Sequence, residues 1–177
     1  MHGNLFRQTG NNRREMIIDR TTPTIKKALI VLGCPEAPAQ QALAFHVAHN
    51  LNKRGSGVLI AGNPSVLNLL KVSDPEKHYI SDTMVMEKCI AEVVEKKRDC
   101  DLCVVFAHND AAIAYAATMR HLLPERKLVV IIFGKDPGPL ADEINFPCEK
   151  IVDKAVHNPM QLRAKINEVF GWAVSRT

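Results

Sequence analysis

The amino-acid sequence predicts an α/β fold, a three-layer α/β/α sandwich around a mostly parallel sheet of about five strands. Two observations predict this class. Short, continuous apolar runs recur along the chain, as in strands that are buried on both faces of a parallel sheet. Segments with a helical spacing of apolar residues separate these runs, and such alternation is typical of parallel strands joined by helical crossovers.

The first strand–helix–strand unit is the clearest part of the pattern. Residues 28–32 (ALIVL) predict a strand that ends at Gly33. Two prolines bracket the start of a helix that we expect near Glu36, because the missing N–H of proline costs little in a first turn. Apolar residues follow on one stripe, and basic residues and glycines close the helix before a second strand at 58–61.

The remaining elements follow from the same patterns and from asparagine residues at helix starts. In chain order they are a short helix at 63–71, a helix at 84–97, a strand at 101–107, a helix at 109–123, a strand at 127–133, a short helix at 139–144, a strand at 150–155 and a helix at 158–174. There is no internal repeat or interdomain linker. Residues 25–177 are therefore expected to form a single α/β domain after a flexible, basic extension at residues 1–24.

A parallel sheet brings every strand-to-helix junction to one edge, the carboxyl edge. For five such strands we expect the flavodoxin-like or Rossmann-like order 2-1-3-4-5, whose topological switch lies between the first and third strands. This order places Cys34 close to His108 and Asn109. We therefore expect the functional site in that crevice.

Composition narrows the classes of function. The 177 residues are 46% apolar and carry a net charge of +4, with no apolar run long enough to span a membrane and no secretory signal. These features predict a cytoplasmic protein with no membrane partner. Basic residues do not form a stripe interleaved with aromatic residues, which argues against nucleic-acid binding. No GxGxxG fingerprint or Walker loop follows the first strand, which argues against a classical nucleotide site.

The junctions at the carboxyl edge supply the candidate site. Cys34 and His108 are the candidate catalytic residues, since a thiol before a helix start has a lowered pKa and an imidazole titrates near neutral pH. Helix N-termini that meet in one crevice favour an anion. We therefore expect a small anionic metabolite or cofactor, whose identity the sequence leaves open, and no metal ion. The predicted ligand crevice consists of Gly33, Glu36, Asn63, Asn109, Asp110, Gly134, Lys135, His157 and Asn158.

The other cysteines are expected to be structural. Cys89 lies within the apolar stripe of its predicted helix and should be in the core. Cys100 and Cys103 have the CxxC spacing of redox or zinc pairs, but the motif ends a helix and enters a strand, at the edge opposite the crevice. Five cysteines in a chain predicted to be cytoplasmic also argue against a disulfide framework.

Several spaced segments carry a family resemblance: GCPE, GNPS, DPEKHYI, HNDAAIAYA, IIFG and the HNP motif followed by LR. Over residues 27–170 the chain resembles a family of uncharacterised proteins from methane-producing archaea, described as a Rossmann-like three-layer α/β sandwich. The resemblance implies an archaeal cytoplasm and a homo-oligomer such as a dimer. It implies no chemistry, because none is established for the family.

Two alternatives stand beside an anion-binding protein. The strand, proline-containing turn and helix around Cys34 also resemble sulfur-relay domains of the DsrE type, with this cysteine as the carrier. The other alternative is a non-enzymatic assembly or interaction subunit, which would need an exposed apolar interface. Whether the protein is an enzyme stays open at this point.

Overall fold

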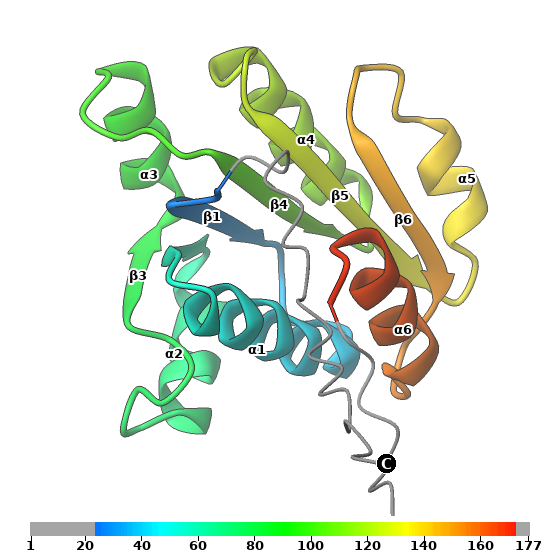
Figure 1. Cartoon of the computed structure of the whole chain (residues 1–177). Helices are drawn as coiled ribbons and strands as arrows, with labels where there is room; N and C mark the ends of the chain where they lie inside the picture. Colours follow the sequence, from blue (N-terminus) through cyan, green and yellow to red (C-terminus); the bar gives the residue numbers. More distant parts are fainter. Residues whose placement is uncertain (1–23, 173–177) are drawn as a thin grey trace, which may run out of the picture.

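The computed structural model describes residues 24–172, in which parallel strands form one sheet of six with the order β3-β2-β1-β4-β5-β6 (Figure 1). The predicted extension at residues 1–24 lies, apart from its last residue, outside the described residues. The strands are β1 (Lys27–Leu32), β2 (Gly57–Gly62), β3 (Asp82–Val85), β4 (Leu102–Ala107), β5 (Lys127–Gly134) and β6 (Glu149–Lys154).

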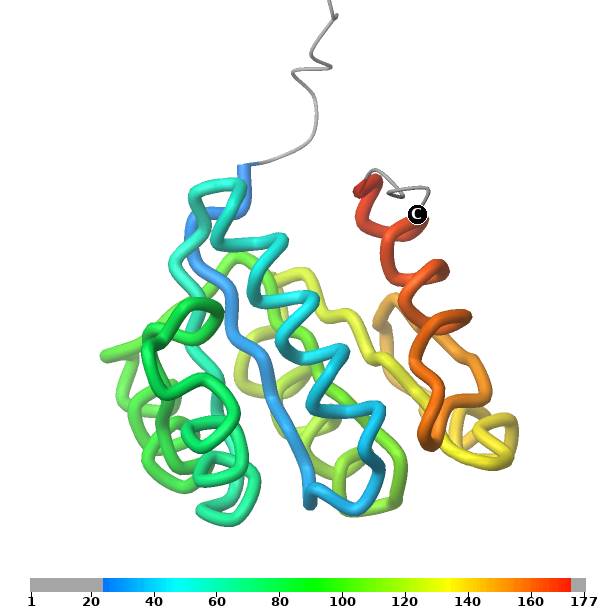
Figure 2. Tube along the Cα trace, turned by 90° about the horizontal axis from the view of Figure 1, so that it is seen from below, coloured from blue at the N-terminus to red at the C-terminus, as the bar shows by residue number. Residues whose placement is uncertain are grey.

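Helices cover both faces of the sheet. Because successive side chains of a strand point to opposite faces, the core divides in two. Ile30 and Leu32 of β1 belong to a cluster with one set of helices, and Leu29 and Val31 belong to a cluster with the other. The first set is α1 (Pro38–Lys53), α2 (Pro64–Ser73) and α6 (Met160–Val169); the second is α3 (Met86–Val94), α4 (Asp110–Leu122) and α5 (Pro137–Asp142). Figure 2 shows α1 and α6 lying along the same face.

The sheet differs from the predicted one in the number and order of its strands. A sixth strand, β3, pairs with β2 and forms an edge, so the full order is 3-2-1-4-5-6 and differs from the expected five-strand order 2-1-3-4-5 by this added strand. Among themselves, the five expected strands keep the expected succession, as β2-β1-β4-β5-β6. The side chains of β3 are exposed or half-buried, and Met84 fits the helical spacing of α3. For this reason the sequence indicated one helix at 84–97. The five expected strands are present, and every pairing is parallel.

Several helix boundaries also differ from those predicted: α3 ends at Val94 and not at residue 97, and α5 spans Pro137–Asp142 and not 139–144. α1 begins at Pro38, two residues after Glu36, and its cap residue Ala37 has no side-chain acceptor to offer. α6 ends at Val169, short of the expected limit at residue 174. The later start of α1 matters for the candidate site, because it lengthens the connection that carries Cys34.

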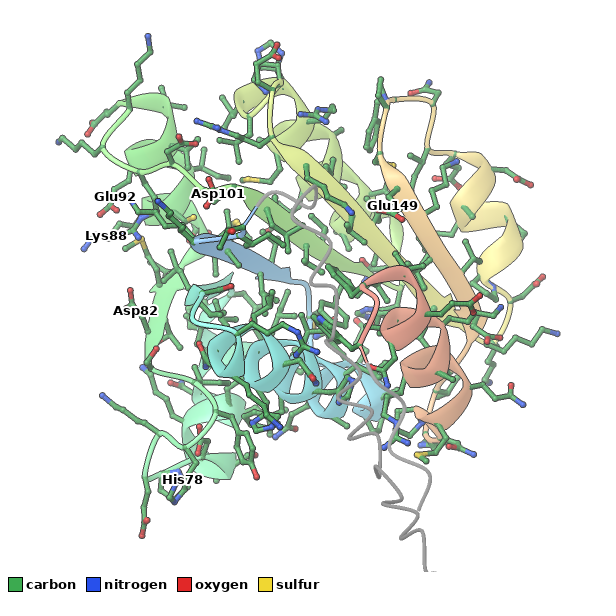
Figure 3. All side chains as sticks on the ribbon, viewed as in Figure 1. His78, Asp82, Lys88, Glu92, Asp101 and Glu149 are labelled. Carbon is green, nitrogen blue, oxygen red and sulfur yellow. The ribbon has the colours of Figure 1, made fainter. Side chains whose placement is uncertain are left out.

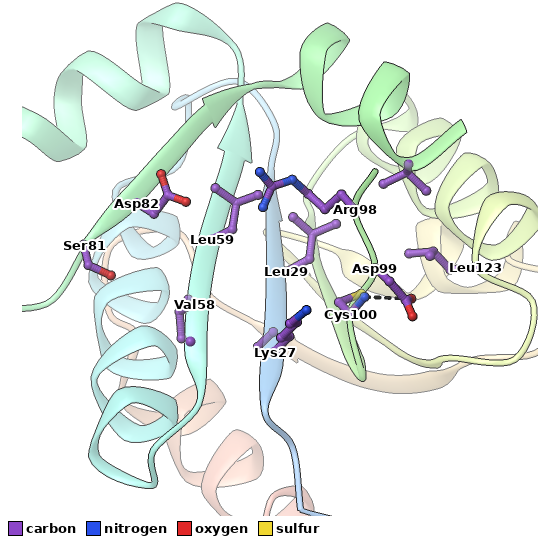
Figure 4. A pocket seen from close by; sticks show the side chains of 13 residues that line it. Lys27, Leu29, Val58, Leu59, Ser81, Asp82, Arg98, Asp99, Cys100 and Leu123 are labelled. Atoms are coloured by element: carbon purple, nitrogen blue, oxygen red, sulfur yellow. Dashed lines mark hydrogen bonds between the residues drawn. The ribbon is translucent and has the colours of Figure 1, made fainter. Parts of the chain in front are cut away.

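At the amino edge of the sheet, one carboxylate links the start of β4 to the start of β1 by hydrogen bonds. Asp101, labelled in Figure 3, accepts the backbone N–H groups of Lys27 and Lys26 at 2.9 and 2.8 Å, and these bonds hold the pKa of Asp101 below its ordinary value. A cavity of about 280 Å³ at this edge is lined in part by Arg98 and Cys100 (Figure 4). Cys100 and Cys103 are both buried free thiols, as a structural role requires.

Candidate functional site

The connections that follow β1 and β4 meet at the carboxyl edge. The chain runs outward from β1 to β3 and then crosses back to β4, so the topological switch lies between β1 and β4, the place where open α/β sheets bind ligands. Gly33 directly follows β1, and a Cβ there would stand 3.9 Å from Cε1 of His108 and 3.5 Å from Cβ of Ala112. Both distances are ordinary van der Waals contacts, so the backbone at Gly33 lies against the imidazole. The structure thus brings Gly33 and His108 together.

The side chain of His108 is almost completely enclosed at this edge. Only 6% of its side chain is exposed, and its ring lies 5.5 Å from the ring of Phe133, centroid to centroid. Nε2 has two polar neighbours, a carboxylate oxygen of Glu36 at 3.5 Å and Nδ2 of Asn109 at 3.4 Å. Nδ1 is buried and has no partner among the described residues. Buried nitrogens are nearly always hydrogen-bonded in proteins, so this atom is unusual.

The cap of α4 influences which nitrogen of His108 carries the proton. Asn109 caps the helix by accepting the backbone N–H of Ala112 on its Oδ1 at 3.1 Å. Its Nδ2 donor is thereby turned toward Nε2 of His108. An Nε2 that accepts leaves the hydrogen on Nδ1 of the neutral ring. With Nε2 accepting from Asn109, Nδ1 is a buried N–H donor that has no acceptor within residues 24–172, whereas donation from Nε2 to the Glu36 carboxylate leaves Nδ1 as an acceptor.

A second buried polar group, which the sequence analysis missed, lies beside the same glycine. Gln40 is 1% exposed, and its Nε2 donates to the carbonyl oxygens of Gly33 and Cys34 at 3.4 Å each. Its Oε1 is buried without a partner in the described part of the chain. One signal was available: Gln40 precedes Ala44 by one helical repeat, so it is a polar residue on the apolar stripe of α1.

Cys34 has the exposure of a reactive thiol but not the helix environment that was expected. It is an exposed free cysteine. However, it precedes the first residue of α1 by four positions, and that residue, Pro38, has no N–H. The next N–H, of Ala39, is bonded to the carbonyl of Val156 at 3.0 Å. The first turn of α1 therefore offers Cys34 little of the positive potential on which its predicted activation rested.

The remaining predicted site residues follow the other strands at the same edge. Asn63 caps α2 by accepting the N–H of Val66 at 2.9 Å, and Asn158 accepts the N–H of Met160 at 3.0 Å. These capping roles fit the sequence interpretation. Within residues 24–172 no hydrogen bond or ion pair joins them to the His108 group. The same holds for three exposed residues, Asp110, Lys135 and His157, and for half-buried Gly134.

Metal and membrane features were also sought in residues 24–172. No group of three His, Cys, Asp or Glu side chains in this range is placed to hold a metal ion. None of the helices in this range has the length and apolar character needed to cross a membrane.

Comparisons with known proteins agree with the architecture and are silent on chemistry. The chain is 29% identical over 144 residues to "Uncharacterized protein MJ0452" of Methanocaldococcus jannaschii, covering 80% of this chain and 95% of that protein. A solved structure titled "Structure of MT0777" is 38% identical and superposes with a TM-score of 0.77, covering 82% of this chain and 97% of the other.

A more distant likeness concerns the fold alone. A glycosyl transferase of family 9 from Veillonella parvula is 15% identical, with a TM-score of 0.50 over 88% of this chain and 41% of the enzyme. A family profile described as "Domain of unknown function (DUF1890)" matches residues 29–169. The resemblance drawn from the spaced sequence segments is thereby confirmed: the chain belongs to the DUF1890 family, whose known relatives include an uncharacterised protein of a methane-producing archaeon.

Proposed function

We propose that this protein binds a small anionic metabolite or cofactor at the carboxyl edge of its sheet, in the predicted crevice between the connections after β1 and β4. One observation carries the proposal: Nδ1 of His108 is buried, lacks a partner in the described residues and lies at the topological switch. An anion supplies the acceptor that a buried N–H requires.

The surrounding groups support a ligand that is an anion and also carries a hydrogen-bond donor. The first amides of α4 have no intrahelical acceptor, and the helix dipole favours negative charge near them. Oε1 of Gln40 provides an acceptor beside the same glycine. A carboxylate or phosphate ester that also carries a hydroxyl or amino group would satisfy both His108 and Gln40. Glu36, 64% exposed, lies at the rim, where it can turn toward solvent.

The test uses phosphate as the anion and the exposed Cys34 as a local reporter. Phosphate should slow the alkylation of Cys34, with chloride at equal ionic strength as the reference, because general salt effects also stabilise proteins. In H108Q the phosphate-dependent protection should fall about tenfold or more, as expected for a charge-assisted hydrogen bond. H121Q, which changes a histidine at the exposed end of α4, is the matched control.

Two results would overturn the proposal. One is that phosphate protects Cys34 no better than chloride does. The other is that H121Q weakens the protection as much as H108Q does. Asn109→Ala should also weaken it, and its loss of helix stability, about 1 kcal/mol for a cap, is measured separately in chloride.

A second candidate function, thiol or sulfur transfer through Cys34, is favoured only by the exposure of that thiol. Mass spectrometry of the protein purified from its own source tests it, since a persulfide would add one sulfur to the Cys34 peptide.

A cytoplasmic location fits five cysteines that are all free. The alternative of an assembly or interaction subunit needs an exposed apolar surface, and so does a homo-oligomer. Both are supported by the exposed Val85 on edge strand β3 and the exposed Val72 on α2.

A further inference from the structure

A second cavity lies away from the carboxyl-edge site of His108. It is formed between the C-terminal half of α1 and α6, two helices that run side by side in Figures 1 and 2. Its volume of about 550 Å³ is within the range of small-molecule sites. Its lining is almost entirely cationic or amide: Lys53, Arg54, Arg163, His46, His49 and two asparagines. We call this cavity the basic cavity.

The permanent cations of the basic cavity have no counter-charge among the residues that the structure describes. Within residues 24–172, none of Lys53, Arg54 and Arg163 takes part in an ion pair. Nε of Arg163 is buried and has no hydrogen-bond partner in that range. A buried guanidinium donor without an acceptor is costly, and such atoms commonly mark the position of an ion or ligand.

The walls of the basic cavity are fixed by hydrogen bonds. Nε2 of His46 lies 2.6 Å from Oδ1 of the buried Asn167, which joins α1 to α6. Asn50 accepts from Arg54 on its carbonyl and side-chain oxygens at 2.9 and 3.1 Å. The guanidinium of Arg54 also lies 5.2 Å from the ring centroid of Trp172. Arg54 is therefore held in place before any ligand arrives, which reduces the entropy that this side chain loses on binding.

Burial and the neighbouring charges in the basic cavity also act on the pKa of His46. Burial lowers the pKa of His46, its hydrogen bond with Asn167 opposes this, and Arg163 and His49 lower it further. His46 is thus disposed to stay neutral, and the fixed positive charge comes from the lysine and the two arginines.

Helix stability accounts for only part of this arrangement. Basic residues near the C-terminus of a helix complement its dipole, which explains Lys53 and Arg54 at the end of α1. It does not explain Arg163, which belongs to another helix and lies in its first turn, where the dipole disfavours a cation.

We propose that the basic cavity binds a diphosphate group, either free or as part of a larger ligand. A single phosphate ester carries about −1.5 to −2 charges at pH 7, so three fixed cations exceed the charge of one phosphoryl group and match that of two. The two guanidinium groups provide forked donors suited to phosphate oxygens. The basic cavity is separate from the carboxyl-edge crevice and does not depend on its function.

The experiment measures pyrophosphate binding by isothermal titration calorimetry, without divalent metal ions and at constant ionic strength. K53Q and R163Q should each weaken binding by about tenfold or more, as expected for loss of a charged hydrogen-bond donor. The control is K88Q, which removes the same charge from exposed Lys88 on α3, labelled in Figure 3. K53Q changes an exposed side chain, so the test does not depend on whether R163Q folds.

Two further arms make the result specific. Orthophosphate should bind more weakly than pyrophosphate. Adenosine diphosphate distinguishes the sources: tighter binding than pyrophosphate indicates a diphosphate ester, and equal binding indicates free diphosphate. Protection of Cys34 by phosphate should be unchanged in K53Q, which separates the basic cavity from the carboxyl-edge crevice. The proposal is overturned if pyrophosphate does not bind, if K88Q weakens binding as much as K53Q, or if only an oligonucleotide binds.

Discussion

Burial divides the five cysteines into thiols that can react and thiols that cannot. Cys34 is exposed, Cys148 is half-buried, and the other three are buried. Burial raises the pKa of Cys89 to about 11 and that of Cys100 to about 12, and it raises the pKa of Cys103 well above the ordinary value. Because the thiolate is the nucleophile, both poor access and a small thiolate fraction suppress the reaction of these three cysteines.

We therefore expect iodoacetamide at pH 8 to label Cys34 first. Cys148, whose pKa is also raised by burial, should follow more slowly. Cys89, Cys100 and Cys103 should be labelled only at the rate of unfolding. Peptide mapping by mass spectrometry over a time course gives the five rates. Equal labelling of Cys34 and Cys89 in the folded protein would contradict the burial seen here.

Single residues also show where sequence reasoning stops. The position of His108 at the end of a strand could be predicted, because an apolar run and an asparagine cap mark that junction. The burial of its ring could not, since the ring lies against Gly33, which follows another strand, and against Phe133 of a third strand. The grouping of Arg163 with Lys53 was missed for a similar reason: helix periodicity says which face is apolar but not which helices are neighbours.

At the scale of elements, the junction between β2 and α2 depends on a missing side chain. A Cβ at Gly62 would stand 2.6 Å from Cγ1 of Val66 and 3.1 Å from the carbonyl oxygen of Leu32. Valine is stiff and the carbonyl belongs to the neighbouring strand, so neither can move without disturbing the core. Gly62 thus allows the first turn of α2 to pack against the end of β1.

Gly62→Ala should lower the free energy of unfolding by about 1–3 kcal/mol, the usual cost of overpacking. Gly57→Ala is the matched control on the same strand, because its Cβ would stand 3.7 Å from the nearest atom, the carbonyl oxygen of Lys26, an ordinary contact. Urea unfolding followed by circular dichroism measures both. If the two variants lose equal stability, close packing at Gly62 is not the cause.

The elements themselves were largely predictable, and the exceptions have physical reasons. Strands buried on both faces give unbroken apolar runs, as in β4, where all six residues are buried. The edge strand β3 has no such run, because one of its sides lacks a neighbouring strand and its side chains are only partly covered. The strand count, and with it the full strand order, therefore failed at this edge. The five expected strands kept their expected neighbours, so the connection with His108 and Asn109 still follows a strand paired with β1.

At the scale of the whole molecule, two carboxylates hold backbone segments in place by accepting N–H groups, Asp74 within one connection and Asp101 between two distant strands. Asp74, 6% exposed, accepts the backbone N–H groups of His78, Tyr79 and Ile80 at 2.8–2.9 Å and so fixes the connection from α2 to β3. Asp101 fastens the start of β1 to that of β4. Burial acts to raise the pKa of Asp74, but the three N–H donors outweigh it, and the pKa is lowered.

These two carboxylates predict how stability depends on pH. Each has a folded-state pKa below its ordinary value of 3.8, so the unfolded chain takes up protons first as the pH falls. Their contribution is complete at neutral pH, begins to decline near the unfolded pKa and is lost as the pH falls through the folded pKa. His46, lowered from 6.5, causes a separate and earlier decline that starts as the pH drops below that value.

Asp74→Asn and Asp101→Asn should therefore reduce stability at pH 7, by about 1–2 kcal/mol for the buried Asp74, since a neutral amide accepts N–H groups less strongly than a carboxylate. Both variants should lose less stability than the unmodified protein between pH 5 and pH 3.

Asp142→Asn, at an exposed carboxylate with no partner in the described residues, is the control and should follow the unmodified protein throughout. Urea unfolding at several pH values gives the curves. Because His46 is present in all four proteins, its effect is common to them and cancels in the comparison. A curve for Asp74→Asn parallel to that of the unmodified protein below pH 5 would show that this carboxylate does not couple acid to unfolding.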